Sequence, residues 1–478
     1  MTAAGPAVCV VGDALLDVDW HGAVDRVCRD APVPVVEDSS ETDRPGGAAL
    51  AAVFVAASGA RTSLVTALSP DRNGRRLRML LARAGVEVVD LGLEGPTPVK
   101  LRLRAGGQSV ARVDRWCLPI VTPGAWSTEA TARVRAADAV LVSDYGRGLA
   151  TQAERAGLAE LAGVPGAGGR PLLWDPHVAG PRPPHYSLLT TPNLAEAHAL
   201  SGRAGSAPCR LPDIVALAAE VAGVLGSATV VTAGPLGAVL ADGQAPPAVV
   251  PALPIQGDVC GAGDCFAASA AAAVAAGRSL LQAVEGAVAD AQAFVSGRVP
   301  TAARWHALSG AASGNSAVIA LPTTGGEPDA IRAAAAVRRA GGVVVAAGGC
   351  FDVLHAGHVR LLEQARRLGD HLVVCLNGDR SVRRLKGAHR PLNTAADRAA
   401  VLRGLGCVDG VVTFDGDTPC AALRAIRPDL FVKGSDYEGL ELAEREVMAE
   451  WGGQVVLLPV VDGHSTTQLI ATAVAAAG

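Results

Sequence analysis

The sequence has few aromatic residues, almost no net charge and no paired-cysteine motif. Aromatic residues are 3% of the 478 residues, so Ala, Val and Leu must build the buried cores. The 42 Lys and Arg against 46 Asp and Glu leave a net charge of −4, which gives no electrostatic basis for binding nucleic acid or a membrane surface. The ten cysteines include no CxxC pair, which favours reduced thiols in the cytoplasm over disulfide bonds or a zinc site.

Long hydrophobic runs are missing as well. The longest, near residues 266–276, is Ala-dominated and too short to cross a membrane. The N-terminal segment contains Asp13 and Asp17 without a preceding basic region, so we expect no export signal. In contrast, 50% of the residues are hydrophobic, 56 are glycine, and the length allows two or more domains. This composition indicates an α/β protein that acts on small molecules.

Short apolar segments recur through the first half of the chain, and each precedes an Ala-rich helical stretch. This alternation predicts a parallel sheet covered by helices on both faces. Residues 99–114 instead alternate apolar and polar residues around a Gly-Gly pair, which predicts an exposed antiparallel hairpin, a candidate lid. The clearest strand segments are residues 7–12, 139–143, 171–174 and 228–232.

The pattern lapses near residue 301 into Gly- and Ser-rich sequence followed by an Ala/Arg helix, and a new apolar strand at 343–349 starts a second α/β series. We therefore predict a first domain at 1–305, a linker at 306–341 and a second domain at 342–478.

A glycine-rich loop, residues 257–264, precedes a long apolar helix in the first domain. Glycines at a helix start let backbone N–H groups converge on a phosphate, and the helix dipole adds attraction. Asp264, in the first turn, is placed to accept a proton from an attacking hydroxyl. For Gly-Ala-Gly-Asp alone, an ordinary first-turn acid that stabilises the dipole is an equally good interpretation.

Four more motifs accompany this loop: VGDALLD (11–17), RPGGAA (44–49), SDYGRG (143–148) and TPNLAE (191–196). Their order resembles that of ribokinase-like, or PfkB, sugar kinases over about residues 7–300. The resemblance implies a three-layer domain with a small β lid, with Asp264 as the catalytic base. It implies an anion hole at Gly261, Ala262 and Gly263, Mg-ATP organised by Asn193 and Glu196, and sugar contacts at Asp13, Asp17, Gly46, Gly47, Lys100 and Arg102.

Two positions depart from this family's pattern. Leu50 stands where the family usually has an Asn that can bind sugar hydroxyls, and Cys260 stands where Thr is common. A sugar hydroxyl that lacks this hydrogen-bond partner would weaken the free energy of substrate binding by on the order of 1–3 kcal/mol. The departures concern substrate affinity more than phosphoryl transfer, since Asp264 and the glycines persist.

In the second domain, a strand leads into CFDVLHAGH, residues 350–358, and an amphipathic helix that ends near Leu368. The i, i+3 spacing puts His355 and His358 on one face at the helix start, and Gly357 leaves room for a phosphate. A metal pair or a packed polar cap would also fit the two histidines alone. Neither alternative explains Gly357 and the preceding Phe-Asp.

Residues 348–370 carry the HxGH signature of the nucleotidyltransferase superfamily, which includes cytidylyl- and adenylyltransferases. Later motifs keep the expected order through residue 474, and this half resembles the Rossmann-like adenylyltransferase half of bifunctional heptose 7-phosphate kinase/heptose 1-phosphate adenylyltransferases. The resemblance implies that His355 and His358 stabilise charge on the α-phosphate. It implies nucleotide contacts at Gly349, Phe351, Asp352, Gly357, Lys386, Lys433, Asp436, Ser465, Thr466 and Thr467.

Some of these residues have simpler interpretations when taken alone. Residues 465–467 could cap a helix, the two lysines could be surface charges, and Asp436 could form a turn.

The whole chain resembles the bifunctional heptose enzymes, which implies ATP-dependent phosphorylation of heptose 7-phosphate at C1 and adenylyl transfer from ATP to heptose 1-phosphate. A separate phosphatase acts between these steps, Mg²⁺ serves both, and we expect a cytoplasmic homodimer without nucleic-acid or membrane partners. Two alternatives remain open: a degenerate kinase-fold scaffold with only the second activity, and the same chemistry on another sugar or alditol phosphate.

Overall fold

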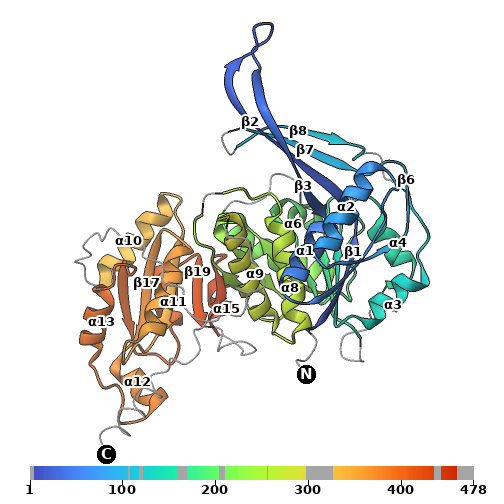
Figure 1. The fold of residues 1–478 in the computed structure, drawn as a ribbon. Helices are drawn as coiled ribbons and strands as arrows, with labels where there is room; N and C mark the ends of the chain where they lie inside the picture. The colour runs from blue at the N-terminus through green and yellow to red at the C-terminus, as the bar shows by residue number, and fades with distance from the viewer. Residues whose placement is uncertain are drawn as a thin grey trace, which may run out of the picture. The chain divides into compact units, whose positions relative to one another are not determined.

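A computed structural model describes residues 5–105, 108–117, 122–158, 169–203, 210–255, 257–297, 327–434 and 443–459. The chain divides into two compact units. The first comprises Met1–Ala204, Val224–Thr232 and Pro254–Ala311, and the second comprises Gly205–Gly223, Ala233–Leu253 and Ala312–Gly478. Figure 1 shows helices and strands alternating in both.

The first unit is built on a parallel sheet of strand order β13-β12-β11-β10-β1-β4-β5. Three predicted strands have the predicted bounds, and the segment at 171–174 starts and ends one residue later than predicted. They could be recognised because strands buried on both faces form continuous apolar runs. The strands are β1 (Ala7–Gly12), β4 (Arg61–Thr66), β5 (Glu87–Asp90), β10 (Ala139–Ser143), β11 (Leu172–Asp175), β12 (Leu189–Thr190) and β13 (Ala228–Thr232).

Helices cover both faces of this sheet. On one face, α3 and α4 bury Val134 and Leu149 against Val140 and Trp174 of the sheet. On the other side in Figure 1 lie α1, α8 and α9, of which α1 and α8 contact β1 and β10. The helices are α1 (Ala48–Ala57), α2 (Arg72–Arg83), α3 (Thr128–Ala136), α4 (Leu149–Arg155), α6 (Leu194–Ser201), α8 (Ala262–Ala275) and α9 (Leu280–Val295).

A separate sheet of order β3-β2-β7-β8 forms the lid of the first unit. Strands β7 (Val99–Ala105) and β8 (Gln108–Arg115) pair antiparallel, which confirms the predicted hairpin, although its Gly-Gly turn lies outside the described residues. The sequence did not reveal β2 (Ala14–Val27) and β3 (Pro34–Gly47), a long antiparallel pair that extends the lid. Their charged residues form cross-strand pairs and so obscure the apolar alternation by which a strand is recognised.

The second unit contains a parallel sheet of order β18-β17-β16-β19-β20. The predicted strand at 343–349 is β16, from Val344 to Gly349. Strands β17 and β18 lie on one side of β16, whereas β19 and β20 lie on its other side, so the strand order reverses at β16. Ligands of such sheets bind where the strand order reverses, at the carboxyl ends of the strands. The other strands are β17 (His371–Asn377), β18 (Gly410–Phe414), β19 (Leu430–Gly434) and β20 (Gln454–Leu458).

The Ala/Arg helix of the predicted linker is α10 (Glu327–Arg339). It contributes buried Ala330 and Ala334 to the same core as Val344 and Val373, so it packs on the second sheet. The remaining elements of this unit are α7 (Leu211–Leu225), the antiparallel pair β14 (Ala238–Ala241) and β15 (Ala248–Val250), α11 (Ala356–Arg367), α12 (Asp379–Lys386), α13 (Ala395–Arg403), α14 (Cys420–Ile426) and α15 (Ala443–Ala449).

Two further observations concern both units. The nine cysteines in the described ranges are free. Over the same ranges, none of the helices combines the length and apolar character that a membrane span requires.

Candidate active sites

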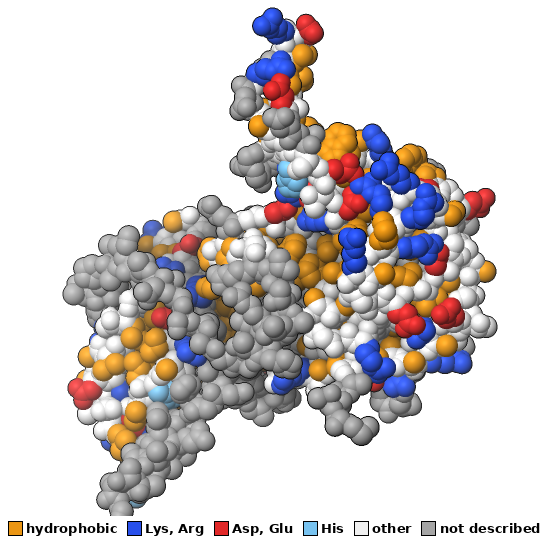
Figure 2. Space-filling model, viewed as in Figure 1, with side chains coloured by type: hydrophobic (Ala, Val, Ile, Leu, Met, Phe, Trp, Pro, Cys, Tyr) orange, Lys and Arg blue, Asp and Glu red, His pale blue; other side chains and the backbone are white. Residues whose placement is uncertain are grey.

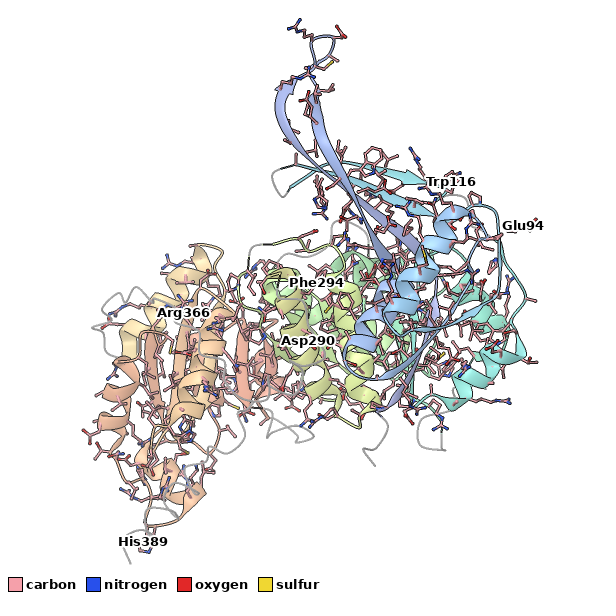
Figure 3. The ribbon with its side chains drawn as sticks, in the orientation of Figure 1. Glu94, Trp116, Asp290, Phe294, Arg366 and His389 are labelled. Carbon is pink, nitrogen blue, oxygen red and sulfur yellow. The ribbon has the colours of Figure 1, made fainter. Side chains whose placement is uncertain are left out.

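The glycine-rich loop of the first unit opens directly into α8. Gly261 precedes the helix with φ 95°, a left-handed conformation that suits glycine, and no side chain caps the helix start. A Cβ atom added to Gly261 would lie 2.8 Å from Cδ2 of Leu50 and 3.4 Å from the Phe294 ring, which Figure 3 labels on α9. No side chain therefore blocks the approach of an anion to the start of α8, although the Ala262 N–H donates to the Val259 carbonyl oxygen over 3.0 Å.

Asp264 lies in the first turn of α8 and is 6% exposed. The Tyr145 hydroxyl donates a hydrogen bond to Oδ1 of Asp264 over 2.7 Å. Burial raises the pKa of Asp264 from 3.8 to about 7, while this hydrogen bond opposes the rise. A carboxylate with a pKa near neutrality is well suited to take a proton from a hydroxyl group.

Three further carboxyl groups gather at the carboxyl ends of β1, β10 and β11. Burial raises the pKa values of Asp13 and Asp144, the latter to about 7, and burial together with Asp264 raises the pKa of Asp175 well above its usual range. Sequence reasoning missed Asp144 and Asp175. The available signal was an acidic residue at the end of a buried strand, since the carboxyl ends of parallel strands meet at one edge.

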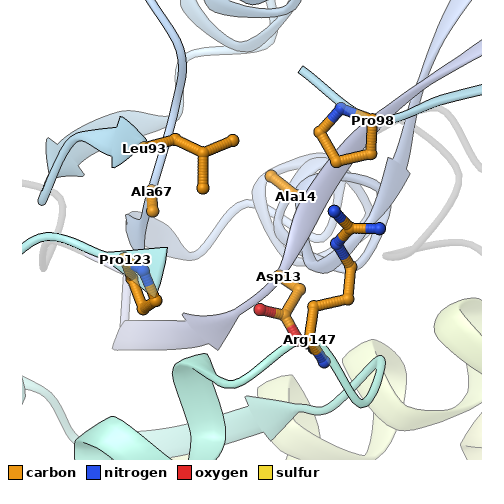
Figure 4. Close-up of a pocket in the computed structure, with 7 residues that line it drawn as sticks. All are labelled: Asp13, Ala14, Ala67, Leu93, Pro98, Pro123 and Arg147. Atoms are coloured by element: carbon orange, nitrogen blue, oxygen red, sulfur yellow. Dashed lines mark hydrogen bonds between the residues drawn. The ribbon is translucent and has the colours of Figure 1, made fainter. Parts of the chain in front are cut away.

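The predicted sugar-binding residues Asp13, Asp17, Gly46 and Gly47 lie together. The Asp13 carboxylate accepts backbone hydrogen bonds from Arg147 and Leu149 over 3.1 and 3.3 Å. A Cβ atom on Gly46 would lie 2.7 Å from Oδ2 of Asp17, and one on Gly47, with φ 62°, would lie 2.5 Å from the carbonyl oxygen of Asp13. Figure 4 shows the small pocket beside them, lined by Asp13, Ala14, Ala67, Leu93, Pro98, Pro123 and Arg147.

Positively charged side chains of the lid lie beside the predicted sugar-binding residues. The Arg102 guanidinium donates to Oδ1 of Asp17 over 2.6 Å, so the two predicted sugar contacts neutralise each other in a buried ion pair. The Lys100 ammonium lies 5.2 Å from the centroid of the Tyr145 ring. Arg104, which sequence reasoning missed, bridges Asp19 of the lid and Asp258 of the glycine-rich loop over 3.0 and 2.5 Å.

Asn193 and Glu196 form the start of α6. The Asn193 side chain accepts from the backbone N–H of Glu196 over 3.0 Å, and the Glu196 carboxylate accepts from the backbone N–H of Asn193 over 2.8 Å, a reciprocal capping box. Burial raises the pKa of Glu196. Glu196 also lines an open pocket with Pro176, His177, Val178, Gly180, Pro181, Arg182, Ala199 and Leu200.

The two histidines of the second unit stack at the start of α11. Their ring centroids are 3.7 Å apart with an interplanar angle of 26°, and the Phe351 ring centroid lies 5.1 Å from that of His358. Phe351 has φ 44°, a left-handed turn that redirects the chain after β16 and Gly349. Burial, with smaller effects from His355 and Lys386, lowers the pKa of His358 to about 4, so this ring is neutral at pH 7.

Asp352 holds a neighbouring loop rather than pointing to open solvent. Its carboxylate forms an ion pair with Arg390 at 2.5 Å and accepts a backbone hydrogen bond from Leu392 over 2.7 Å. The Asn393 side chain donates to the Asp352 carbonyl oxygen over 2.8 Å. Asp352 was predicted to contact the nucleotide, but its buried carboxyl group is already engaged by residues 390–393.

The guanidinium of Arg398 joins three loops of this site, and sequence reasoning missed it. It donates to the carbonyl oxygens of Cys350, Asn377 and Asn393 over 2.6, 2.7 and 3.0 Å and to the Asp379 carboxylate over 2.8 Å. The side chain is almost fully buried on α13. It therefore fixes the segments after β16 and β17 relative to each other.

Replacing Arg398 by Met should lower the free energy of unfolding of the second unit by about 3–5 kcal/mol, because it removes the donor to Asp379 and to three buried or partly buried carbonyl oxygens. Hydrogen exchange of the backbone amides of β16 and β17, measured at increasing urea concentrations, tests this effect. Arg403→Met on the same helix is the matched control and should change little. Equal protection in the two variants would contradict the role given to Arg398.

The two predicted lysines differ in their surroundings. Lys433 Nζ lies 2.9 Å from Oε1 of Glu444 in a largely buried pair, so its charge is neutralised within the protein. Lys386 ends α12 and is exposed. Asp436, Ser465, Thr466 and Thr467 lie outside the described residues.

Known proteins resemble both halves of the chain. The family model of pfkB family carbohydrate kinases matches residues 6–305, and the cytidylyltransferase-like family model matches residues 346–467. These matches confirm the predicted fold class, a ribokinase-like part followed by a nucleotidyltransferase-like part.

Curated relatives match almost the entire length. "Bifunctional protein HldE" of Streptomyces coelicolor is 47% identical over 97% of this chain and 96% of its own. The protein of that name from Halorhodospira halophila is 40% identical over the same shares. Among solved structures, ribokinase from Thermotoga maritima is 20% identical, with a TM-score of 0.48 over 63% of this chain and 98% of its own.

Proposed function

The chain belongs to the family of bifunctional HldE proteins, and we propose that its two halves catalyse two steps of ADP-heptose formation. It is a sugar kinase and a nucleotidyltransferase, and ATP is its substrate in both roles. The first half phosphorylates D-glycero-D-manno-heptose 7-phosphate at C1. The second transfers the adenylyl group of ATP to heptose 1-phosphate and releases pyrophosphate. The observation that carries this proposal is the same in each half: a helix start without a side-chain cap that carries the reactive side chains, Asp264 in α8 and the stacked His355 and His358 at the start of α11.

In the kinase half, Asp264 takes the proton of the C1 hydroxyl as its oxygen attacks the γ-phosphate. Gly261, Ala262 and Gly263 form the anion hole around the transferred phosphoryl group, and the α8 dipole adds to its stabilisation. Lys100, near Tyr145, supplies positive charge from the lid. Positioning and electrostatics, rather than covalent catalysis, lower the barrier.

Mg²⁺ bound to ATP would neutralise charge on the ATP phosphates. Oxygen ligands of the kind that Mg²⁺ prefers are present in Glu196 and in Asp144, whose buried Oδ2 has no hydrogen-bond partner among the described residues. Across those ranges no group of three or more His, Cys, Asp or Glu could hold a metal ion alone. We assign Asn193 and Glu196, at the start of α6, to orient the ATP-bound ion, and we expect no fixed metal site made by protein ligands alone.

In the second half, His355 and His358 stabilise negative charge on the α-phosphate while the phosphate oxygen of heptose 1-phosphate attacks it in line. Gly349, Phe351 and Gly357 shape the backbone around the triphosphate, and Asp352 and Arg398 hold the loops that border it. We assign the remaining nucleotide contacts to Lys386, Lys433, Asp436 and residues 465–467.

The two reactions do not share an intermediate directly. The kinase product carries phosphates at C1 and C7, whereas the second reaction takes a sugar with the C1 phosphate only, so a separate phosphatase acts between them. We place the enzyme in the cytoplasm, where ATP is plentiful. The two catalytic parts span 1–305 and 342–478, and α10 in the connecting segment packs with the second part.

A homodimer formed through the lid completes the proposal. Figure 2 shows hydrophobic side chains among charged ones on the lid, and Trp20, Val113 and Trp116 are exposed there. Exposed apolar side chains of this kind favour contact with a partner surface.

A stepwise assay with the full chain tests the proposed reactions. Heptose 7-phosphate and ATP should give ADP, and addition of the phosphatase with further ATP should give ADP-heptose and pyrophosphate, followed by mass spectrometry. If no ADP formed in the first step, the first half would be a kinase-fold scaffold without activity. Equal turnover of other sugar or alditol phosphates would overturn the assignment of heptose, and CTP or GTP in the second step tests the nucleotide.

A further inference from the structure

Tyr145 lies in the SDYGRG segment, to which the proposed mechanism assigns no step. The segment joins β10 to α4 and passes beside the kinase site. Its tyrosine hydroxyl donates a 2.7 Å hydrogen bond to Oδ1 of Asp264, a residue 119 positions later in the chain. The side chain thus contacts the one carboxyl group that must accept a proton.

Several contacts fix the Tyr145 ring. Its backbone N–H donates to the Asp13 carboxylate over 3.4 Å, so the segment is tied to the sugar-binding end. Its ring stacks on His177 with centroids 6.4 Å apart and an interplanar angle of 19°. On the lid side, the Lys100 ammonium lies 5.2 Å from the ring centroid. A ring held by the sheet edge and the lid has little freedom to move its hydroxyl.

We propose that Tyr145 is a positioning residue for the kinase reaction: its hydroxyl holds Oδ1 of the Asp264 carboxylate, so that the second oxygen is turned to the sugar hydroxyl. The proposal rests on the role of Asp264 in the proposed function. A carboxylate has two oxygens and several acceptor sites, so a donor on Oδ1 leaves Oδ2 able to accept the proton of the sugar hydroxyl.

The charged groups that face Asp264 explain why such a donor is needed. Burial is the largest effect that raises the pKa of Asp264, and the carboxylates of Asp17 and Glu196 raise it further. Asp175 also interacts with it. Opposing these are Tyr145 and, more weakly, Lys100. The pKa of Tyr145 itself is raised well above its usual range by burial and by Asp264, so the hydroxyl keeps its proton through the physiological pH range.

Tyr145→Phe in the full chain tests the proposal through the pH profile of ADP formation. Without the donor, the pKa of Asp264 should rise, so the acid limb of kcat should move to higher pH by about one unit. The rate at pH 7 should fall roughly 5- to 10-fold and largely recover near pH 9. KM for ATP should not change, and pyrophosphate release by the second half should stay at the wild-type rate. The recovery of ADP formation near pH 9 shows that the kinase unit itself is folded.

A second substitution predicts a change of opposite sign. Replacing Tyr145 by 3-fluorotyrosine makes the hydroxyl a stronger donor with almost the same shape, so the acid limb should move to lower pH. Because this variant retains every packing contact, it also gives an answer if Tyr145→Phe folds poorly. Tyr186→Phe, at a partly buried tyrosine packed beside α3 and α4, is the matched control and should reproduce the wild-type profile.

The outcomes separate this inference from the function on which it rests. If Asp264→Asn abolishes ADP formation while the profiles of the Tyr145 variants superimpose on that of the wild type, Tyr145 has no positioning role and the kinase assignment stands. If Asp264→Asn retains ADP formation, the assignment of the base fails first. A lower kcat with an unshifted acid limb would also overturn the proposal, because it would indicate packing alone.

Discussion

Asp264→Asn should lower the rate of ADP formation by about 10³-fold and leave pyrophosphate release by the second half unchanged. General base catalysis contributes roughly 10²- to 10⁴-fold, and an amide of the same shape can still accept from Tyr145 but cannot take the proton of the sugar hydroxyl. Turnover of heptose 7-phosphate with ATP, followed as ADP, measures the loss. A variant within tenfold of the wild type would remove Asp264 from the role of base.

The same substitution should stabilise the first unit at alkaline pH. Burial raises the pKa of Asp264 in the folded protein from 3.8 to about 7. The protonated carboxyl therefore favours folding fully below its unfolded pKa, and this contribution is lost as the pH rises through about 7. The amide introduced by Asp264→Asn does not ionise, so the variant should gain roughly 1–3 kcal/mol over the wild type at pH 8 and much less at pH 4.

Calorimetric melting of both proteins between pH 4 and pH 8 checks this expectation. Asp30→Asn, at an exposed carboxyl group of the same unit, is the control and should track the wild type. A stability difference that does not grow with pH would show that Asp264 ionises in the folded protein as easily as in the unfolded chain.

His355→Ala and His358→Ala should each reduce pyrophosphate release by about 10²- to 10³-fold, with ADP formation by the kinase half unaffected. Each change removes a half-buried ring that faces developing charge, and the loss of a single donor to such charge has effects of this size. The assay supplies heptose 1-phosphate and ATP directly. His389→Ala, at an exposed histidine beyond α12 that Figure 3 labels, should keep the wild-type rate.

The stacked geometry of the two rings adds a stricter expectation. Because the rings lie 3.7 Å apart and act on the same phosphate, the double variant should lose little more than the worse single variant. If the fold-loss of the double variant equalled the product of the two single losses, the two rings would act independently. Pyrophosphate release close to the wild-type rate in either single variant would contradict a catalytic role for the pair.

The sequence by itself determined the elements whose signals are local. Strands β1, β10 and β13 form continuous apolar runs because both faces are buried, and their bounds were predicted correctly. Asp264 at a glycine-rich helix start and His355 three residues before His358 could be recognised because the helical turn alone brings these groups to one end of a helix. The order of the motifs then indicated a kinase followed by a nucleotidyltransferase.

Only the tertiary structure decided which of these residues meet and what their charges experience. The pairs Tyr145 with Asp264, Arg102 with Asp17 and Lys433 with Glu444 join different elements. The burial that moves the pKa values of Asp264 and His358 comes from packing around them. No local pattern encodes such contacts, because they arise when strands and helices far apart in the chain are packed side by side, and the free energy of an ionised group depends on all the atoms that then replace water around it.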